Sequence, residues 1–148
     1  MHLEVWFALC YTVTVGTGGR LVPERKMSLS VRTEKIMDCI FCKIAAGEIP
    51  STKVFENEKI LAFKDLNPQA PVHLLVIPKE HIASADEING ENSGIVAEIF
   101  ANIPKIAAEA GLSDGYRIIT NIGENGCQSV KHMHFHILGG AKLAERMC

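Results

Sequence analysis

Apolar residues recur at steps of three or four along residues 92–110, which is the period of an α-helix. They form one stripe, made of Ile95, Ile99, Ile103, Ile106 and Ala110. The stripe predicts one long helix that packs this side against a sheet. Gly111 ends the pattern, as glycine commonly does after the last turn of a helix.

The other apolar runs are short and rich in residues that favour strands. They predict five strands, over residues 52–56, 60–64, 72–77, 116–120 and 132–138. Residues 57–59 join the first two as a hairpin. A short helix is predicted near the start of this region, capped by Asp38 and ended by Gly47. Together these elements predict an α+β domain with a five-stranded antiparallel sheet, one main helix and a short N-terminal helix.

Residues 1–36 differ in character from the rest of the chain. They carry five Lys or Arg against three Asp or Glu, whereas residues 37–148 carry ten against fourteen. The apolar run at 3–15 is too short to span a bilayer, and no positive charge precedes it as in a signal peptide. We interpret 1–36 as an N-terminal extension that is disordered or lies upstream of a natural start at Met37. A targeting segment is the alternative.

Composition restricts the classes of partner. The chain of 148 residues has a net charge of −2 and shows no basic stripe, which argues against nucleic acid. Five cysteines are an odd number, and their spacing does not suggest a disulfide framework. We therefore expect one cytoplasmic domain over 37–148, with no membrane partner and no organic cofactor.

The strongest chemical signal is a row of histidines at alternate positions, His132, His134 and His136. Side chains alternate along a strand, so the three imidazoles should share one face. Just before them, residues 123–129 combine glycines with short polar side chains, a composition that can direct N–H groups at an anion. The combination predicts a phosphate held in front of a nucleophile. The alternative is a half-buried strand whose polar face is histidine by coincidence.

The segment Gln128-Ser129-Val130-Lys131-His132-Met133-His134-Phe135-His136-Ile137-Leu138 resembles the His-x-His-x-His signature of the histidine-triad (HIT) superfamily. The following Gly139-Gly140 is similar to the Hint branch, the histidine-triad nucleotide-binding proteins. The resemblance covers roughly residues 38–140 and implies a homodimer. Cys127 departs from it, because relatives in this branch usually have glycine there.

The resemblance implies a hydrolase that cleaves purine nucleoside phosphoramidates, or related nucleoside 5′-phosphoryl compounds, to the nucleoside monophosphate. His134 would be the nucleophile and would form a nucleotidyl-histidine intermediate. The supporting catalytic residues would be His132, His136, His73 and Ser129. Two alternatives remain: a dinucleoside polyphosphate hydrolase, and a nucleotide-sensing module with negligible turnover.

The resemblance also implies a nucleotide-binding set. Asp65 would accept hydrogen bonds from the ribose, and Asn121 would flank the phosphate. Phosphate contacts would come from Gln128, Ser129, His134 and His136, and an apolar base pocket from Ile40, Phe41, Phe63 and Leu66. Phe63 and Leu66 could equally be core residues.

A metal site is the remaining prediction. Cys39-x-x-Cys42 has the spacing of a pair of metal ligands, and His81 with His132 would complete a Cys2His2 tetrahedron. Several bacterial HIT proteins resemble this pattern. Four protein ligands leave no open position, so the ion would be a structural zinc. The alternative is two buried thiols and a surface histidine.

Overall fold

The computed structural model describes residues 38–145, so the predictions for residues 1–36 lie outside the described residues. The elements in chain order are α2 (Ile40–Ala45), β1 (Lys53–Glu56), β2 (Ile60–Lys64), β3 (Val72–Pro78), η1 (Ala85–Glu87), α3 (Gly94–Glu109), β4 (Tyr116–Ile119) and β5 (Phe135–Gly139). No helix in this part of the chain is long and apolar enough to cross a membrane.

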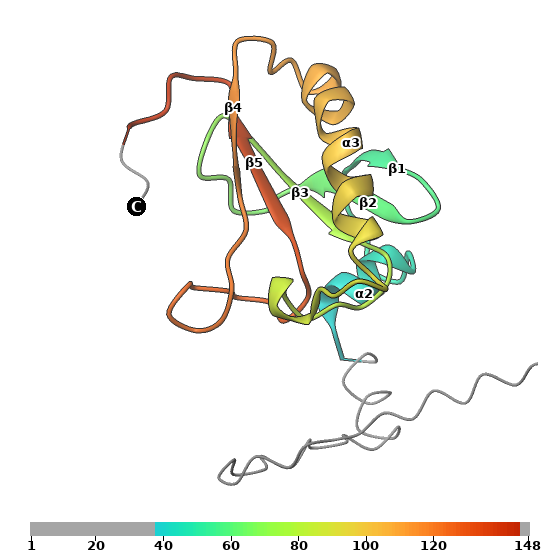
Figure 1. Ribbon diagram of the computed structural model, residues 1–148. Helices are drawn as coiled ribbons and strands as arrows, with labels where there is room; N and C mark the ends of the chain where they lie inside the picture. The colour runs from blue at the N-terminus through green and yellow to red at the C-terminus, as the bar shows by residue number, and fades with distance from the viewer. Residues whose placement is uncertain (1–37, 146–148) are drawn as a thin grey trace, which may run out of the picture.

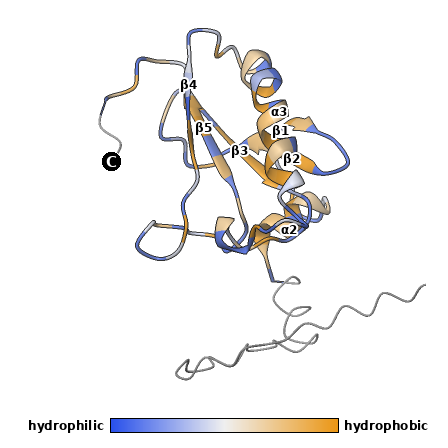
Figure 2. Ribbon diagram, in the orientation of Figure 1, coloured by the Kyte–Doolittle hydropathy of each residue, from blue (hydrophilic) through white to orange (hydrophobic). Residues whose placement is uncertain are grey.

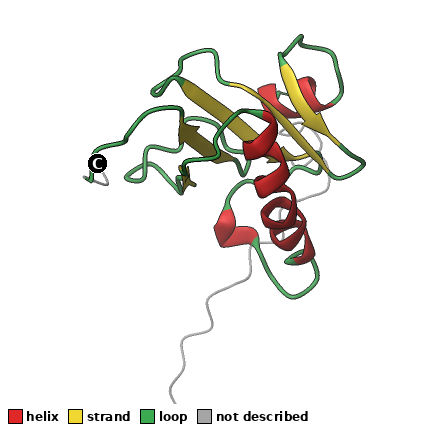
Figure 3. Ribbon diagram, turned by 90° about the horizontal axis from the view of Figure 1, so that it is seen from above, coloured by secondary structure: helices red, strands yellow, loops and turns green. Residues whose placement is uncertain are grey.

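The five strands form one antiparallel sheet in the order β1-β2-β3-β5-β4, which confirms the predicted fold class. Figure 1 shows α3 lying along one face of this sheet and α2 at its lower end. The view from above in Figure 3 shows α3 set against the strands. The hairpin between β1 and β2 forms because Asn57 Oδ1 accepts hydrogen bonds from the N–H groups of Lys59 and Ile60, both at 2.8 Å.

Two apolar clusters cover the two faces of the sheet. On one face the buried stripe of α3 packs against alternate strand residues, among them Ile60, Leu74, Val76 and Ile137. On the other face Phe41 and Ile44 of α2 pack against the intervening residues, Leu61, Phe63, Leu75 and Ile77. Since β2 and β3 are buried on both faces, they read as continuous apolar runs, which Figure 2 shows in orange.

Most element boundaries agree with the pattern to within two residues, but two predictions were wrong in detail. The residue that caps α2 is Cys39, and no side chain makes a cap hydrogen bond there. The thiol of Cys39 instead faces His132 Nδ1 at 3.4 Å. Asp38 lies one residue before the cap, where its carboxylate is 3.9 Å from Lys43 Nζ.

The last strand starts at Phe135, not at residue 132. If the β3–β5 register continued, Pro78 would face Met133, and proline has no N–H for the ladder. The Met133 N–H therefore bonds to the Ile82 carbonyl at 2.6 Å, outside the sheet. Side chains still alternate: Met133, Phe135 and Ile137 join the cluster under α3, which leaves the three imidazoles on the α2 side.

Candidate active site and metal centre

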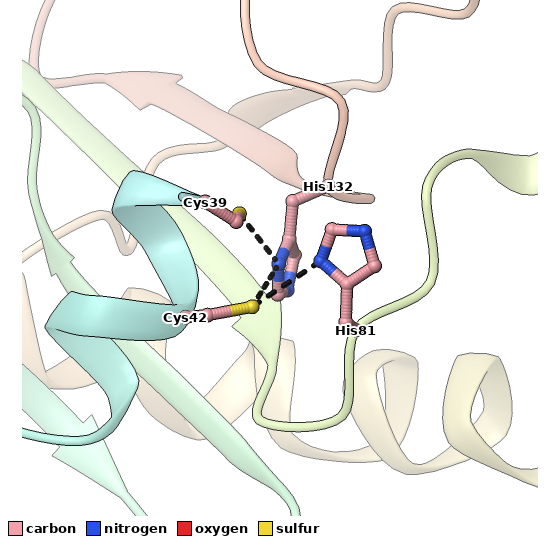
Figure 4. A group of neighbouring side chains, drawn as sticks. All are labelled: Cys39, Cys42, His81 and His132. Atoms are coloured by element: carbon pink, nitrogen blue, oxygen red, sulfur yellow. Dashed lines mark hydrogen bonds between the residues drawn. The ribbon is translucent and has the colours of Figure 1, made fainter. Parts of the chain in front are cut away.

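Four side chains from three distant segments converge beside α2. Cys39 caps α2 and Cys42 lies on it, His81 comes from the loop after β3, and His132 from the segment before β5 (Figure 4). Their ligand atoms all lie within 4.8 Å of one another. Cys42 Sγ is 3.2 Å from His81 Nδ1 and 3.5 Å from His132 Nδ1, and Cys39 Sγ is 3.4 Å from His132 Nδ1. The structure thus brings together all four predicted metal ligands.

The donor set fits a tetrahedral zinc, which takes sulfur and imidazole ligands. His132 is fully buried, and its Nε2–H donates to the Pro78 carbonyl at 2.9 Å. That bond leaves the lone pair on Nδ1, the atom that faces the thiols. Burial, and to a lesser degree the neighbouring Cys39, raise the pKa of the Cys42 thiol to about 12, so an ion binding there would have to displace its proton.

His134 lies next to this cluster and is almost fully buried. Its Nδ1–H donates to the His132 carbonyl at 2.7 Å, so its lone pair is on Nε2, the atom that can attack an electrophile. The Thr120 hydroxyl donates a hydrogen bond to the backbone carbonyl of His134 at 2.9 Å, a contact that we did not predict from the sequence. The Phe41 ring meets the His134 ring edge-on, with centroids 5.3 Å apart.

His136 follows on β5, its ring 5.0 Å from that of His134. Its Nδ1 lies 2.8 Å from His73 Nε2, on the neighbouring strand β3. Asp65 Oδ2 is 3.4 Å from the same His73 nitrogen. Burial lowers the pKa of His136 to about 4, with His134 and His73 contributing and Asp65 opposing. Burial also lowers the pKa of His73. The Asp65 carboxylate and the Asn67 carbonyl raise this pKa, but their effect is smaller than that of burial.

The loop before the histidines is held by hydrogen bonds of its own. Gln128 donates from Nε2 to the carbonyls of Ala83, at 2.6 Å, and Val130, at 3.0 Å, and its Oε1 accepts from Gly123 N–H. This amide, predicted to contact the phosphate, therefore shapes the loop and ties it to the segment after His81. Ser129 is exposed and Asn121 half-buried at the same loop.

Two positions in this loop restrict the residue that they can hold. A Cβ on Gly126 would clash with the Ile122 carbonyl oxygen, so this position requires glycine. Cys127 has a φ of +57°, in the left-handed region that glycine favours. The cysteine therefore adopts the backbone conformation of the glycine that the family resemblance led us to expect.

The four predicted base-pocket residues fall into two pairs. Phe41 and Phe63 are buried in the cluster under α2, their rings edge to face with centroids 5.8 Å apart. Ile40 and Leu66 are 46% and 99% exposed.

A model of the family described as "Scavenger mRNA decapping enzyme C-term binding" matches residues 38–147. A solved HIT family hydrolase from Legionella pneumophila shares 49% identity with a TM-score of 0.71, covering 73% of this chain and 97% of that one. The chain belongs to the HIT family.

Two curated relatives add detail to this membership. The 14 kDa zinc-binding protein of Zea mays is 49% identical over 109 residues, covering 70% of this chain and 83% of its own length. Adenylylsulfatase HINT1 of Arabidopsis thaliana is 42% identical over 106 residues, covering 70% and 72%. Predicted membership of the HIT family is thus confirmed, and the match begins at the first residue that the structure describes.

Proposed function

We propose that this HIT protein hydrolyses purine nucleoside phosphoramidates, or related nucleoside 5′-phosphoryl compounds, through a nucleotidyl-His134 intermediate. The observation that carries the proposal is the 2.7 Å bond from His134 Nδ1–H to the His132 carbonyl, which leaves the lone pair on Nε2 of a buried ring next to His136. Relatives named as a HIT family hydrolase and as an adenylylsulfatase support it.

In the proposed first step, His134 Nε2 attacks the phosphorus and the bond from phosphorus to the leaving group breaks. A leaving amine needs a proton, and the exposed Ser129 hydroxyl can pass one from solvent to that nitrogen. Water then attacks the phosphorus and loses a proton to solvent, and His134 leaves as a neutral imidazole. Hydrogen-bond donors around the phosphoryl oxygens stabilise the charge in both steps.

Substrate binding follows from the same residues. Asp65 would accept from the ribose hydroxyls, and the base would lie against Ile40, Phe41, Phe63 and Leu66. Asn121, His136 and the loop that Gln128 holds would surround the phosphate. Because apolar contact recognises a base by area more than by its hydrogen-bonding edge, we expect adenine and guanine nucleotides to bind with similar affinity.

We also propose that Cys39, Cys42, His81 and His132 hold a structural zinc. The four ligand atoms, the buried Nδ1 of His132 and the zinc-binding relative from maize support this assignment. When bound, the ion would join α2 to the segment that carries His134. Thiol ligands must stay reduced, which is consistent with a cytoplasmic location.

A homodimer is the third part of the proposal. β4 is an edge strand of the sheet, and Phe100 of α3 is 48% exposed although its ring packs on Phe135. An unpaired strand edge and an exposed aromatic side chain are both features that a second copy can cover. Light scattering during size-exclusion chromatography should give twice the mass of one chain.

The experiment for the activity compares three substrates with wild-type protein and His134→Ala: adenosine phosphoramidate, adenosine 5′-phosphosulfate and diadenosine triphosphate. We expect wild-type turnover of the first two and a loss of several orders of magnitude in the variant. Preference for diadenosine triphosphate would mean a dinucleoside polyphosphate hydrolase. Binding of AMP without turnover of any substrate would mean a sensing module.

A further inference from the structure

His73 has a hydrogen-bond partner on each ring nitrogen. The backbone N–H of Gln69 points at Nδ1, with 3.1 Å between the nitrogens. On the other side, Nε2 is 2.8 Å from His136 Nδ1 and 3.4 Å from Asp65 Oδ2. A backbone amide can only donate, so His73 Nδ1 must be the acceptor in the first of these contacts.

This contact determines where the protons are. A neutral imidazole carries one N–H and one lone pair, so the lone pair on His73 Nδ1 places its proton on Nε2. That N–H is directed at the closer of its two acceptors, His136 Nδ1. His136 must then carry its own proton on Nε2, the nitrogen away from His73.

We propose that the Gln69 backbone amide and His73 form a tautomer lock, which holds His136 as an Nε2–H hydrogen-bond donor to the phosphoryl oxygens of the substrate. His73 is then a positioning residue. It does not carry a proton to the leaving group, because Nδ1 cannot gain a proton while it accepts from Gln69 N–H. The catalytic meaning of the lock rests on the proposed function, whereas the tautomers themselves do not.

The lock is needed because of Asp65. A carboxylate oxygen of Asp65 and a ring nitrogen of His136 lie within 4.8 Å of each other. Since Nδ1 is the His136 nitrogen that faces His73, the carboxylate would draw the His136 proton to Nδ1 in the absence of the His73 N–H. The Nε2 lone pair would then face the phosphoryl oxygens and repel them. His73 thus keeps the Asp65 carboxylate, which would accept from the ribose, from changing the tautomer of His136, which would donate to the phosphate.

Two other states of this cluster are less compatible with the contacts. A doubly protonated His73 would place an N–H against that of Gln69. The Asp65 carboxylate and the Asn67 carbonyl would stabilise this cation, which raises the pKa of His73. Burial outweighs both effects and lowers that pKa. A metal ion held by Asp65, His73 and His136 would require His73 Nε2 to lose the proton that Gln69 keeps there.

Nitrogen-15 NMR of uniformly labelled wild-type protein at pH 7 tests the lock without any activity measurement, because the histidine nitrogen shifts report each tautomer. We expect the Nε2–H form for both His73 and His136. An Nδ1–H form or a cation at either residue would overturn the proposal. So would a zinc-dependent shift of both rings together with a second equivalent of bound zinc.

Two variants of His73 distinguish a role as hydrogen-bond donor to His136 from a role as proton carrier. The amide nitrogen of glutamine reaches the place of the histidine Nε2, whereas that of asparagine reaches the place of Nδ1. We expect His73→Gln to keep the His136 tautomer and a kcat within several-fold of wild type. His73→Asn should shift His136 toward Nδ1–H and lower kcat about 100-fold, the effect of losing one donor to a developing oxyanion. Equal losses of kcat in the two variants, at equal melting temperatures, would refute the lock.

A wild-type protein with the Nε2–H tautomers but no hydrolysis would refute only the proposed function.

Discussion

Removal of the proposed zinc should lower stability by a large amount. Binding of a ligand to the folded state adds about 4 kcal/mol to the free energy of unfolding when the concentration of free ligand, here the metal, is a thousand times its Kd. For a domain of about 100 residues each kcal/mol moves the melting temperature by roughly 4–8 °C, so the fall should be about 15–30 °C. The sulfur–nitrogen contacts of 3.2–3.5 Å around the fully buried His132 are weak hydrogen bonds, which replace only a small part of the binding energy of the ion.

The variant for this test is Cys39→Ser with Cys42→Ser, which keeps a small polar group at each position. Its matched control is Cys127→Ser, because Cys127 is exposed and outside the cluster. Elemental analysis of protein purified without a metal-affinity tag should give about one zinc per chain in the wild type and the control, and none in the double variant. Calorimetry should then show the fall only in the double variant. Metal-free wild-type protein that melts at the temperature of the zinc-supplemented sample would refute the assignment.

Three further predictions follow from single residues. Ser129→Ala should slow cleavage of adenosine phosphoramidate much more than that of adenosine 5′-phosphosulfate, whose leaving sulfate needs no proton; equal effects in the kinetic assay would contradict the role of the hydroxyl. Cys127→Gly should leave the melting temperature unchanged or higher, whereas Cys127→Val should lower it, because a β-branched side chain fits a φ of +57° poorly. The folded-state pKa of His136 is about 4 against an ordinary 6.5, so from pH 6.5 to 4 the unfolded chain gains a proton that the folded chain does not. Urea titrations should therefore show the free energy of unfolding decreasing over this range, with a shallower decrease in His136→Gln.

The sequence predicted the fold well because its patterns are local. The apolar stripe through Ile99, Ile103 and Ile106 faces the sheet as its period requires. Gly47 has a φ of +79° after α2, as expected of a glycine that ends a helix. The start of the last strand was predicted wrongly because it depends on Pro78, a residue that is opposite in the sheet but 55 positions away from Met133 in the chain.

The candidate site was predictable in its residue types but not in its hydrogen bonding. The alternation of His132, His134 and His136 and the Cys-x-x-Cys spacing are visible in the sequence, and the structure places these residues together. The contacts of Gln69 and Thr120 with the histidines are not visible, because one uses a backbone N–H and the other a backbone carbonyl. Backbone groups are present at every position, so no residue pattern indicates them.

The most direct measurement of the central claim is a rapid-quench reaction of wild-type protein with adenosine phosphoramidate, followed by peptide mass spectrometry under conditions that preserve phosphorus–nitrogen bonds. We predict an adenylyl group on the peptide that contains residues 132–136, assigned by fragmentation to His134 and absent from the His134→Ala protein. Hydrolysis by the wild type with no adenylylated peptide at any quench time, or with the adenylyl group on another histidine, would contradict His134 as the nucleophile.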